Sequence, residues 1–296
     1  MADSKLLIKS QDRGSSGVFA RVYADVVGWD LLNMAALRLH KGERYSGEVG
    51  EHEQVTVILG GRCNIRTSVG DYLELGRRAN VFEGMPWALY LPRRATFEIH
   101  ALTEPLEVAS CWVPTDQDHQ PCLVTPKDCP IEIRGGANAT RQINSIIPPG
   151  FNCHRLVCVE VYTPSGNWSS YPPHKHDVHR IDDAGKVLEA DLDEIYFYKI
   201  DNRDNGNGFA YQRVYTSDGG LDELMLARNH DVVLVPEGYH PVVGAQGYTT
   251  YYLNFLAGSA QSLANSDDPA LAWVKSTWKD KDPRLPLVHL GMEGEK

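Results

Sequence analysis

The feature that most constrains the fold is a succession of short β-rich segments with turn residues between them. Gly, Pro, Asn and Asp separate these segments along the whole chain, for example at Gly60-Gly61 and in 204–208. This spacing is typical of an all-β sandwich or barrel. The clearest predicted strands are 55–59, 95–100, 106–113, 156–163, 194–200, 209–216, 232–235 and 248–255.

Helix signals are few, and the clearest one is near the C-terminus. Asp268 can cap a helix whose first position is Pro269, and the helix would continue to Val274. We expect such a helix to pack Leu271 and Trp273 against the wall of a barrel.

The chain also resembles a weak tandem duplication. The segment 51–61 is similar to 191–201, and 81–94 is similar to 231–240. Each half is therefore predicted to form one small antiparallel β-barrel, with few short helices. The stretch 114–149 is rich in Pro, Gly, Asn and Asp, so we interpret it as the connection. The predicted domains are residues 1–130 and 131–296.

Charge and hydropathy restrict the partners. The 29 basic and 39 acidic residues give a net charge of −10, which argues against nucleic acid because phosphate binding needs a basic face. A small anion can still bind where a few basic side chains line a pocket. No apolar run is long enough for a membrane span, and no signal peptide is apparent. The six cysteines lack metal-site spacing, so we expect reduced thiols and a cytoplasmic location.

Four residues of the second half could bind one metal ion. His174 and His176 are two positions apart, so on an extended chain both side chains point to the same face. Glu194 begins a predicted strand, and His240 follows a Pro-Glu-Gly-Tyr turn. Three imidazoles and one carboxylate suit a divalent ion such as zinc, manganese or iron.

These residues resemble the two motifs of the cupin superfamily, a group of small metal-binding β-barrels. The matching positions are Gly166, His174, His176 and Glu194 for the first motif and Pro236, Gly238, His240 and Asn254 for the second. Seventeen residues separate His176 from Glu194, and one residue separates Gly238 from His240. Together with segments 135–142, 160–177, 193–196 and 235–243, these spacings resemble the 5-deoxy-glucuronate isomerase family of inositol catabolism.

The resemblance implies a tandem cupin, or bicupin, with one metal-binding barrel. Glu53 of the first half corresponds to Glu194, yet no histidine there matches His240, so the first barrel is expected to be structural. The implied reaction is a metal-dependent aldose–ketose isomerisation of 5-deoxy-D-glucuronate to 2-deoxy-5-keto-D-gluconate. The substrate would be a small anionic sugar acid. Proton transfer through an enediol and a hydride shift are both compatible with the sequence.

Strand alternation suggests two catalytic residues. If Val159 and Val161 face an apolar cover, Glu160 faces the barrel lumen and could act as the base; otherwise it faces solvent. Tyr252 and Asn254 share one face of the strand after His240. We therefore expect Tyr252 to be catalytic, unless it only fills the barrel, and Asn254 to bind substrate.

Two further residues are assigned from their positions. Arg180 lies in the insertion between His176 and Glu194 and is the first candidate for binding the substrate carboxylate. The other candidates are Arg155, Arg213 and, with less support because its strand parity is opposite to that of Glu194, Lys199. Asp177 directly follows His176 and could orient a ligand imidazole.

Two other functions fit the same pattern. An iron-dependent cupin dioxygenase would use the same four ligands, and a non-catalytic sugar-binding cupin would bind without turnover. Exposed strand edges also make a homo-oligomer possible.

Overall fold

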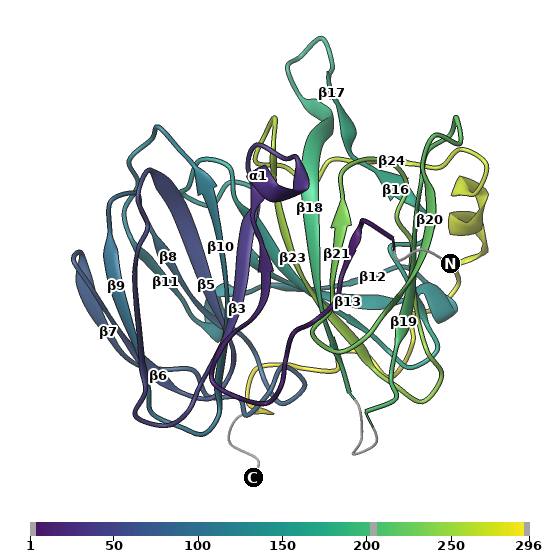
Figure 1. The fold of residues 1–296 in the computed structure, drawn as a ribbon. Coiled ribbons are helices and arrows are strands. Elements are labelled where there is room, and N and C mark those ends of the chain that lie inside the picture. The colour runs from purple at the N-terminus through teal and green to yellow at the C-terminus, as the bar shows by residue number, and fades with distance from the viewer. Residues whose placement is uncertain (1–3, 202–205, 293–296) are drawn as a thin grey trace. The chain divides into compact units, whose positions relative to one another are not determined.

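Antiparallel strands dominate the computed structural model, which describes residues 4–201 and 206–292 (Figure 1). All eight strands predicted above are present, so the prediction of an all-β fold is confirmed. The helices are short: α1 (Ala24–Val27) and the 3₁₀ helices η1 (Pro126–Asp128), η2 (Ala137–Ala139) and η3 (Ala272–Thr277).

The chain divides into two compact units. One unit contains residues 11–130, 150–156 and the chain from 288 onward, and the other contains the chain up to residue 10, 131–149 and 157–287. We refer to them as the N-terminal and C-terminal units. Among the described residues, no helix has the length and apolar character to cross a membrane.

The N-terminal unit contains two antiparallel sheets. The six-stranded sheet has the order β11 (Cys122–Val124), β8 (Trp87–Leu91), β5 (His52–Gly60), β10 (Leu106–Pro114), β3 (Asn33–Leu39) and β2 (Gly17–Val22). The four-stranded sheet has the order β4 (Arg44–Glu48), β9 (Thr96–Ala101), β6 (Cys63–Thr67) and β7 (Gly70–Leu75). Its core is aliphatic and includes Leu37, Ile58, Leu89 and Val108.

The C-terminal unit repeats this plan with a larger main sheet. The order is β1 (Leu7–Ile8), β21 (Val232–Val235), β18 (Val187–Ile200), β23 (Thr250–Gly258), β14 (Val157–Thr163), β13 (Arg141–Ile147) and β12 (Ile131–Arg134), and β17 (Asp177–Ile181) pairs with β18. A second sheet contains β15 (Trp168–Ser169), β22 (Val242–Gly244), β19 (Ala210–Tyr215) and β20 (Asp222–Ala227). A short ladder joins β16 (His174–Lys175) to β24 (Ser266–Asp267).

Side-chain alternation explains which strands are covered on both faces. In β19 buried and exposed residues alternate, as in a strand with one solvated face. Strands β14 and β23 are buried along almost their whole length, because both of their faces are covered. The core of the C-terminal unit includes the aromatic side chains of Tyr196, Tyr198 and Tyr252, so its interior carries hydroxyl groups as well as apolar surface.

Two local expectations were wrong. The stretch 114–149 is more than a connection, because β12 and β13 lie within it and join the main sheet of the C-terminal unit. Near the C-terminus, Asp268 Oδ1 accepts a hydrogen bond from the Ala270 N–H (2.9 Å), as a cap would, but the element that follows is a six-residue 3₁₀ helix. It buries no residue, and Trp273 is 62% exposed, because so short a helix cannot cover a wall with one face.

Candidate metal centre

Three side chains of the C-terminal unit meet around one point. His176 lies between β16 and β17, Glu194 lies in β18, and His240 follows β21. The distance from Glu194 Oε2 is 3.0 Å to His176 Nε2 and 3.3 Å to His240 Nε2. Among residues 4–201 and 206–292, these three form the one group of His, Cys, Asp or Glu whose ligand atoms all lie within 4.8 Å of one another.

Backbone carbonyls fix the orientation of both imidazoles. His176 Nδ1 donates to the Leu192 carbonyl (3.0 Å), and His240 Nδ1 donates to the Gly238 carbonyl (2.8 Å). Because each Nδ1 carries a proton, both Nε2 atoms are directed toward Glu194, and in the neutral ring Nε2 is the nitrogen with a free lone pair. This is the arrangement in which a metal-ligating histidine is usually held by its other nitrogen.

The turn that carries His240 depends on a glycine. Gly238 has φ +83°, and a Cβ there would lie 2.4 Å from the Tyr215 carbonyl oxygen, so a larger residue would have to displace the backbone. Asp177 Oδ2 accepts the Gly238 N–H (2.9 Å). Asp177 therefore acts on His240 through the backbone of Gly238, whose N–H it binds and whose carbonyl binds His240, which is an indirect form of the orienting role suggested by its position.

The three side chains fit a divalent cation. His240 Nε2 is completely buried and makes no hydrogen bond to any described residue, although Glu194 is beside it. Burial lowers the pKa of His240 to about 4, so its imidazole is neutral, as a metal ligand must be. Burial also opposes protonation of His176, but the hydrogen bond to Glu194, the negative charge of Glu194 and backbone hydrogen bonds together outweigh burial and raise the pKa of His176. A cation would satisfy the lone pair and the carboxylate together.

His174 lies at the edge of this group. Its ring centroid is 4.8 Å from that of His240 and 6.3 Å from that of His176. A cavity of the C-terminal unit is lined by His174 together with His176 and Glu194. Its nitrogens lie outside the 4.8 Å group. The structure thus gathers three of the four predicted ligands and places the fourth beside them.

Two other predicted residues line the cavity. The Tyr252 hydroxyl lies 2.5 Å from Ser169 Oγ, and Asn254 Nδ2 makes a long hydrogen bond of 3.5 Å to the Ile195 carbonyl. Tyr196 also lines it, with its ring centroid 6.0 Å from that of His240. Hydroxyl and amide groups therefore face the same space as His176 and Glu194.

Comparison with known proteins decides the family. Residues 6–274 match the model of the KduI/IolB family. The chain belongs to the KduI/IolB family. Among its relatives, the 5-deoxy-glucuronate isomerase of Geobacillus kaustophilus is 39% identical over 92% of this chain and 95% of that protein. The enzyme of the same name from Bacillus subtilis is 38% identical over 82% of this chain and 87% of that protein. The predicted resemblance and the prediction of an isomerase are confirmed.

Solved structures agree with the KduI/IolB assignment. An IolB-like protein from Salmonella typhimurium is 32% identical, has a TM-score of 0.85, and matches 92% of this chain and 99% of its own. Bacillus subtilis oxalate decarboxylase, described with Mn(II) centres, has a TM-score of 0.61 over 90% of this chain and 80% of its own at 13% identity. The second match shows the fold alone and confirms the predicted cupin architecture.

In this KduI/IolB chain, the prediction that Glu160 faces the barrel lumen was wrong. Val159 and Val161 line the cavity, so Glu160 points to the opposite face of β14. There its carboxylate is fully buried and accepts hydrogen bonds from the hydroxyls of Tyr162 (3.1 Å) and Tyr251 (2.8 Å). The error arose because the cavity wall itself is partly apolar, so valines on a strand do not identify its outer face.

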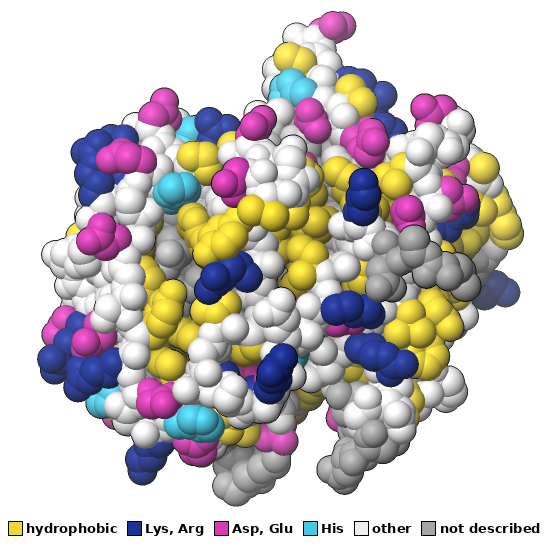
Figure 2. All heavy atoms as spheres, in the orientation of Figure 1, with side chains coloured by type: hydrophobic (Ala, Val, Ile, Leu, Met, Phe, Trp, Pro, Cys, Tyr) yellow, Lys and Arg dark blue, Asp and Glu magenta, His cyan; other side chains and the backbone are white. Residues whose placement is uncertain are grey.

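Arg180 does not line the cavity. It lies in β17, its side chain is 56% exposed, and its guanidinium contacts Glu189 (3.4 Å) and Ser266 Oγ (2.9 Å). In Figure 2 the hairpin formed by β17 and β18 projects from the surface, with hydrophobic and basic side chains along it. The insertion between the ligands is therefore a surface hairpin in this structure.

Several lining residues had not been identified from the sequence. They are Arg134, Arg141, Ser170 and Asn265. Arg134 and Arg141 come from the stretch 114–149, which had been interpreted as a connection. One signal was available, because Arg141 lies in the family-like segment 135–142.

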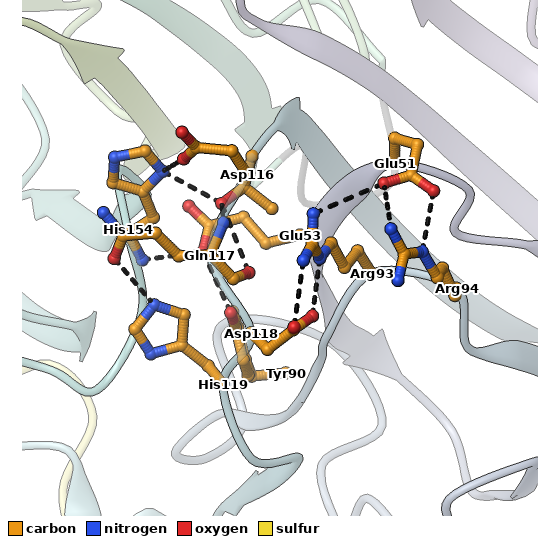
Figure 3. A network of polar contacts seen from close by, with 11 residues as sticks. Glu51, Glu53, Tyr90, Arg93, Arg94, Asp116, Gln117, Asp118, His119 and His154 are labelled. Atoms are coloured by element: carbon orange, nitrogen blue, oxygen red, sulfur yellow. Dashed lines mark hydrogen bonds and ion pairs between the residues drawn. The ribbon is translucent and has the colours of Figure 1, made fainter.

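Glu53 of the N-terminal unit, which the sequence suggested as the counterpart of Glu194, has a structural role. Figure 3 shows Glu53 within a network of polar contacts. The fully buried carboxylate accepts hydrogen bonds from the Tyr90 hydroxyl (2.9 Å) and from the backbone N–H groups of 154–156 (2.8, 2.7 and 3.1 Å). Glu53 thus fastens the segment 150–156 to the N-terminal unit.

Strand register shows that Gln54, rather than Glu53, is the counterpart of Glu194. Glu194 pairs with Val235 and Leu256, and Gln54 pairs with Leu91 and Trp112 in the same positions of its own sheet. Gln54 lines a cavity of about 380 Å³ in the N-terminal unit. The correspondence drawn from the sequence was therefore one residue out of register.

Proposed function

We propose that this KduI/IolB chain is a metal-dependent aldose–ketose isomerase that converts 5-deoxy-D-glucuronate to 2-deoxy-5-keto-D-gluconate. The observation that carries the proposal is the buried group of His176, Glu194 and His240, with the unsatisfied His240 Nε2 at its centre. The name shared by relatives at 36–39% identity supplies the substrate.

The metal would be held by His176, Glu194 and His240, with His174 as the fourth ligand. When bound, a divalent ion supplies Lewis acidity to the carbonyl oxygen and the neighbouring hydroxyl oxygen of the substrate. Zinc, manganese and iron all suit a set of imidazole and carboxylate donors. The Nδ1 hydrogen bonds to Leu192 and Gly238 keep the imidazoles in place before the substrate arrives.

Tyr252 is suited to donate a proton to a substrate oxygen. Burial raises the pKa of its hydroxyl, so the phenol keeps its proton at neutral pH. Ser169 Oγ, 2.5 Å from the Tyr252 hydroxyl, can return a proton to it. Asn254 lies two residues away on the same face, and its weakly bonded amide can hold a second substrate oxygen.

Glu160 is not suited to act as the base in this arrangement. Its carboxylate lies on the opposite face of β14 from the cavity, with Tyr162 and Tyr251. Among the described residues that line the cavity, Glu194 is the one carboxylate. The transfer of hydrogen between the two carbons therefore involves Tyr252, a ligand side chain or the substrate itself.

The test is turnover of 5-deoxy-D-glucuronate by metal-loaded protein, followed by NMR in deuterated water. Formation of the 5-keto product is expected. Deuterium in that product would indicate an enediol. Sugar binding without turnover would instead support a non-catalytic cupin, and oxygen uptake with iron would support a dioxygenase.

We further propose that the enzyme acts in the cytoplasm in inositol catabolism on a small sugar acid, without nucleic-acid partners. All six cysteines are thiols outside any disulfide, and five of them are buried, which suits a reducing compartment. Acidic and basic side chains are interspersed on the face shown in Figure 2, without a basic stripe. A homo-oligomer remains part of the proposal, and light scattering after gel filtration tests it.

A further inference from the structure

Two arginines line the cavity of the metal centre from neighbouring strands. Arg134 ends β12 and Arg141 begins β13, and the two residues are directly paired across the ladder. Like charges placed opposite each other destabilise a pair of strands unless an anion compensates them. The cavity wall therefore carries two positive charges beside the ligand side chains.

Only one of these charges has a carboxylate partner in the part of the chain that the structure describes. Arg134 Nε donates to Glu132 Oε1 (2.6 Å). Arg141 is 9% exposed, and its Nε is buried without a hydrogen-bond partner among the described residues. A guanidinium so deeply buried is costly unless an anion or other acceptors bind it.

The proposed substrate would supply that anion. One end of a sugar acid carries the reacting carbonyl, which belongs at the metal ligands, and the other end carries a carboxylate. The planar guanidinium can donate two parallel hydrogen bonds to a carboxylate, which fixes both position and orientation.

We infer that Arg141, with Arg134 beside it, is the binding site for the substrate carboxylate. The inference rests on the proposed function for the identity of the sugar acid, but the site itself requires only a carboxylate on a sugar-sized molecule. Arg180, the residue expected from the sequence, is already bound to Glu189 and Ser266 on the surface hairpin. Asn265 lines the cavity with the two arginines and can accept or donate a further hydrogen bond.

The experiment compares an anionic sugar with its neutral counterpart. Binding of D-glucuronate and of D-glucose to the metal-loaded protein is measured by saturation-transfer NMR titration, and metal content by mass spectrometry. We expect Arg141→Gln to weaken D-glucuronate binding about 10- to 100-fold and to leave D-glucose binding and metal content unchanged. Arg141→Lys keeps the positive charge but cannot donate two parallel hydrogen bonds. Its affinity for D-glucuronate should therefore lie between those of the unsubstituted protein and Arg141→Gln.

The matched control is Arg213→Gln, because Arg213 is an exposed arginine whose guanidinium pairs with Asp222 (2.7 Å). It should behave as the unsubstituted protein. The inference is overturned if Arg141→Gln binds D-glucuronate normally, loses its metal, or weakens both sugars equally, or if the unsubstituted protein does not prefer D-glucuronate. A larger effect of Arg180→Gln than of Arg141→Gln would also overturn it.

The same variants separate this inference from the proposed function. Turnover of 5-deoxy-D-glucuronate that is indifferent to Arg141→Gln would leave the isomerase standing and remove the carboxylate site. If D-glucuronate binding depended on Arg141 but 5-deoxy-D-glucuronate were not turned over, the carboxylate site would stand and the isomerase proposal would fall. A rise in KM with little change in kcat is expected where both are correct.

Discussion

The two units of the chain present corresponding cavities with different linings. In the C-terminal unit the cavity holds Glu194, Asn254 and Tyr252. The strand register places Gln54, Ser110 and Val108 at the same positions of the N-terminal unit. His240 lies five residues after Val235, and the residue five positions after Leu91 is Thr96. One scaffold thus carries a candidate set of metal ligands in one copy and a cavity without that set in the other.

The carboxylates of the two units differ in environment because they differ by one position in the strand register. Glu194 faces the cavity, whereas Glu53, one position away from the matching register, accepts three backbone N–H groups and a phenol. Neighbouring residues of a strand point to opposite faces, so a shift of one position changes the environment of the charge. A buried carboxylate needs partners in either place, and in one unit they are imidazoles, in the other peptide groups.

The largest effect should come from making the C-terminal centre resemble its counterpart. Glu194→Gln and His240→Ala should each abolish tight metal binding and lower kcat/KM by about 10³-fold or more, because the Lewis acid is lost. Mass spectrometry of the purified protein and the isomerase assay measure the two effects. A variant that retained full metal content would contradict the assignment of ligands.

Tyr252→Phe should have the next largest effect on the reaction. Removal of the proton donor is expected to lower kcat by about 10²-fold while metal content stays unchanged. Tyr196→Phe provides a comparison at another hydroxyl of the same cavity. If Tyr252→Phe turned over normally, Tyr252 would have the packing role that Val108 has in the N-terminal unit.

The turn before His240 offers a more moderate test. Asp177 holds the Gly238 N–H in the C-terminal unit, whereas the Arg94 N–H in the N-terminal unit is held by the Gly50 carbonyl (2.6 Å). Asp177→Ala should weaken metal affinity about 10-fold, as loss of a ligand-orienting contact does. Asp177→Asn keeps an acceptor oxygen and should restore part of the affinity, as measured by competition with a chelator. Equal losses in both variants would argue against an orienting role.

In the N-terminal unit, substitution should affect stability rather than catalysis. Glu53→Gln replaces an acceptor of backbone N–H groups by an amide that also donates, so we expect the free energy of unfolding to fall by about 2 kcal/mol. Urea denaturation measures it, and metal content and kcat should be unchanged.

The adjacent residue provides the matched variant. Gln54→Glu places a carboxylate at the position of Glu194 without imidazoles around it, and the metal content should remain one ion per chain. A second ion per chain would show that the N-terminal unit had lacked only a carboxylate at position 54 for metal binding.

The smallest effect concerns pH. Hydrogen bonds from Arg284 lower the pKa of Asp282 in the C-terminal unit from 3.8 to about 2, whereas the donors to Glu53 are uncharged. The contribution of Asp282 to stability is therefore complete above about pH 4 and is lost as the pH falls through about 2. Asp282→Asn should cost about 0.5–1 kcal/mol at pH 5, and the cost should shrink as the pH falls toward and through 2, as measured by urea denaturation. A pH-independent cost would contradict this account.

The sequence was most informative where periodicity and short-range spacing determine the outcome. All eight strands were identified, and the His-x-His pair, the glutamate of a predicted strand and the turn before His240 were enough to point to the group of His176, Glu194 and His240. These features depend on a few neighbouring residues and on strand alternation.

What could not be predicted depends on contacts between distant segments. The inward face of β14 is set by pairing with β23, so the orientation of Glu160 could not be inferred from its own strand. Arg141 enters the cavity because β12 and β13 extend the main sheet, although they lie in a stretch rich in turn residues. The one-residue error at Glu53 has the same cause, because register is a property of paired strands.

The strand β1 has a consequence for how this chain can be divided. Leu7 and Ile8 pair with Val233 and Val232, so residues from the first ten complete the sheet that contains the candidate ligand Glu194, although residue 131 begins the main body of that unit. A gene fragment starting at residue 131 would expose the backbone of β21 along an open edge, which invites aggregation. A shortened protein that contains only the C-terminal unit should therefore keep the first ten residues, joined to one end of that unit, for example by circular permutation.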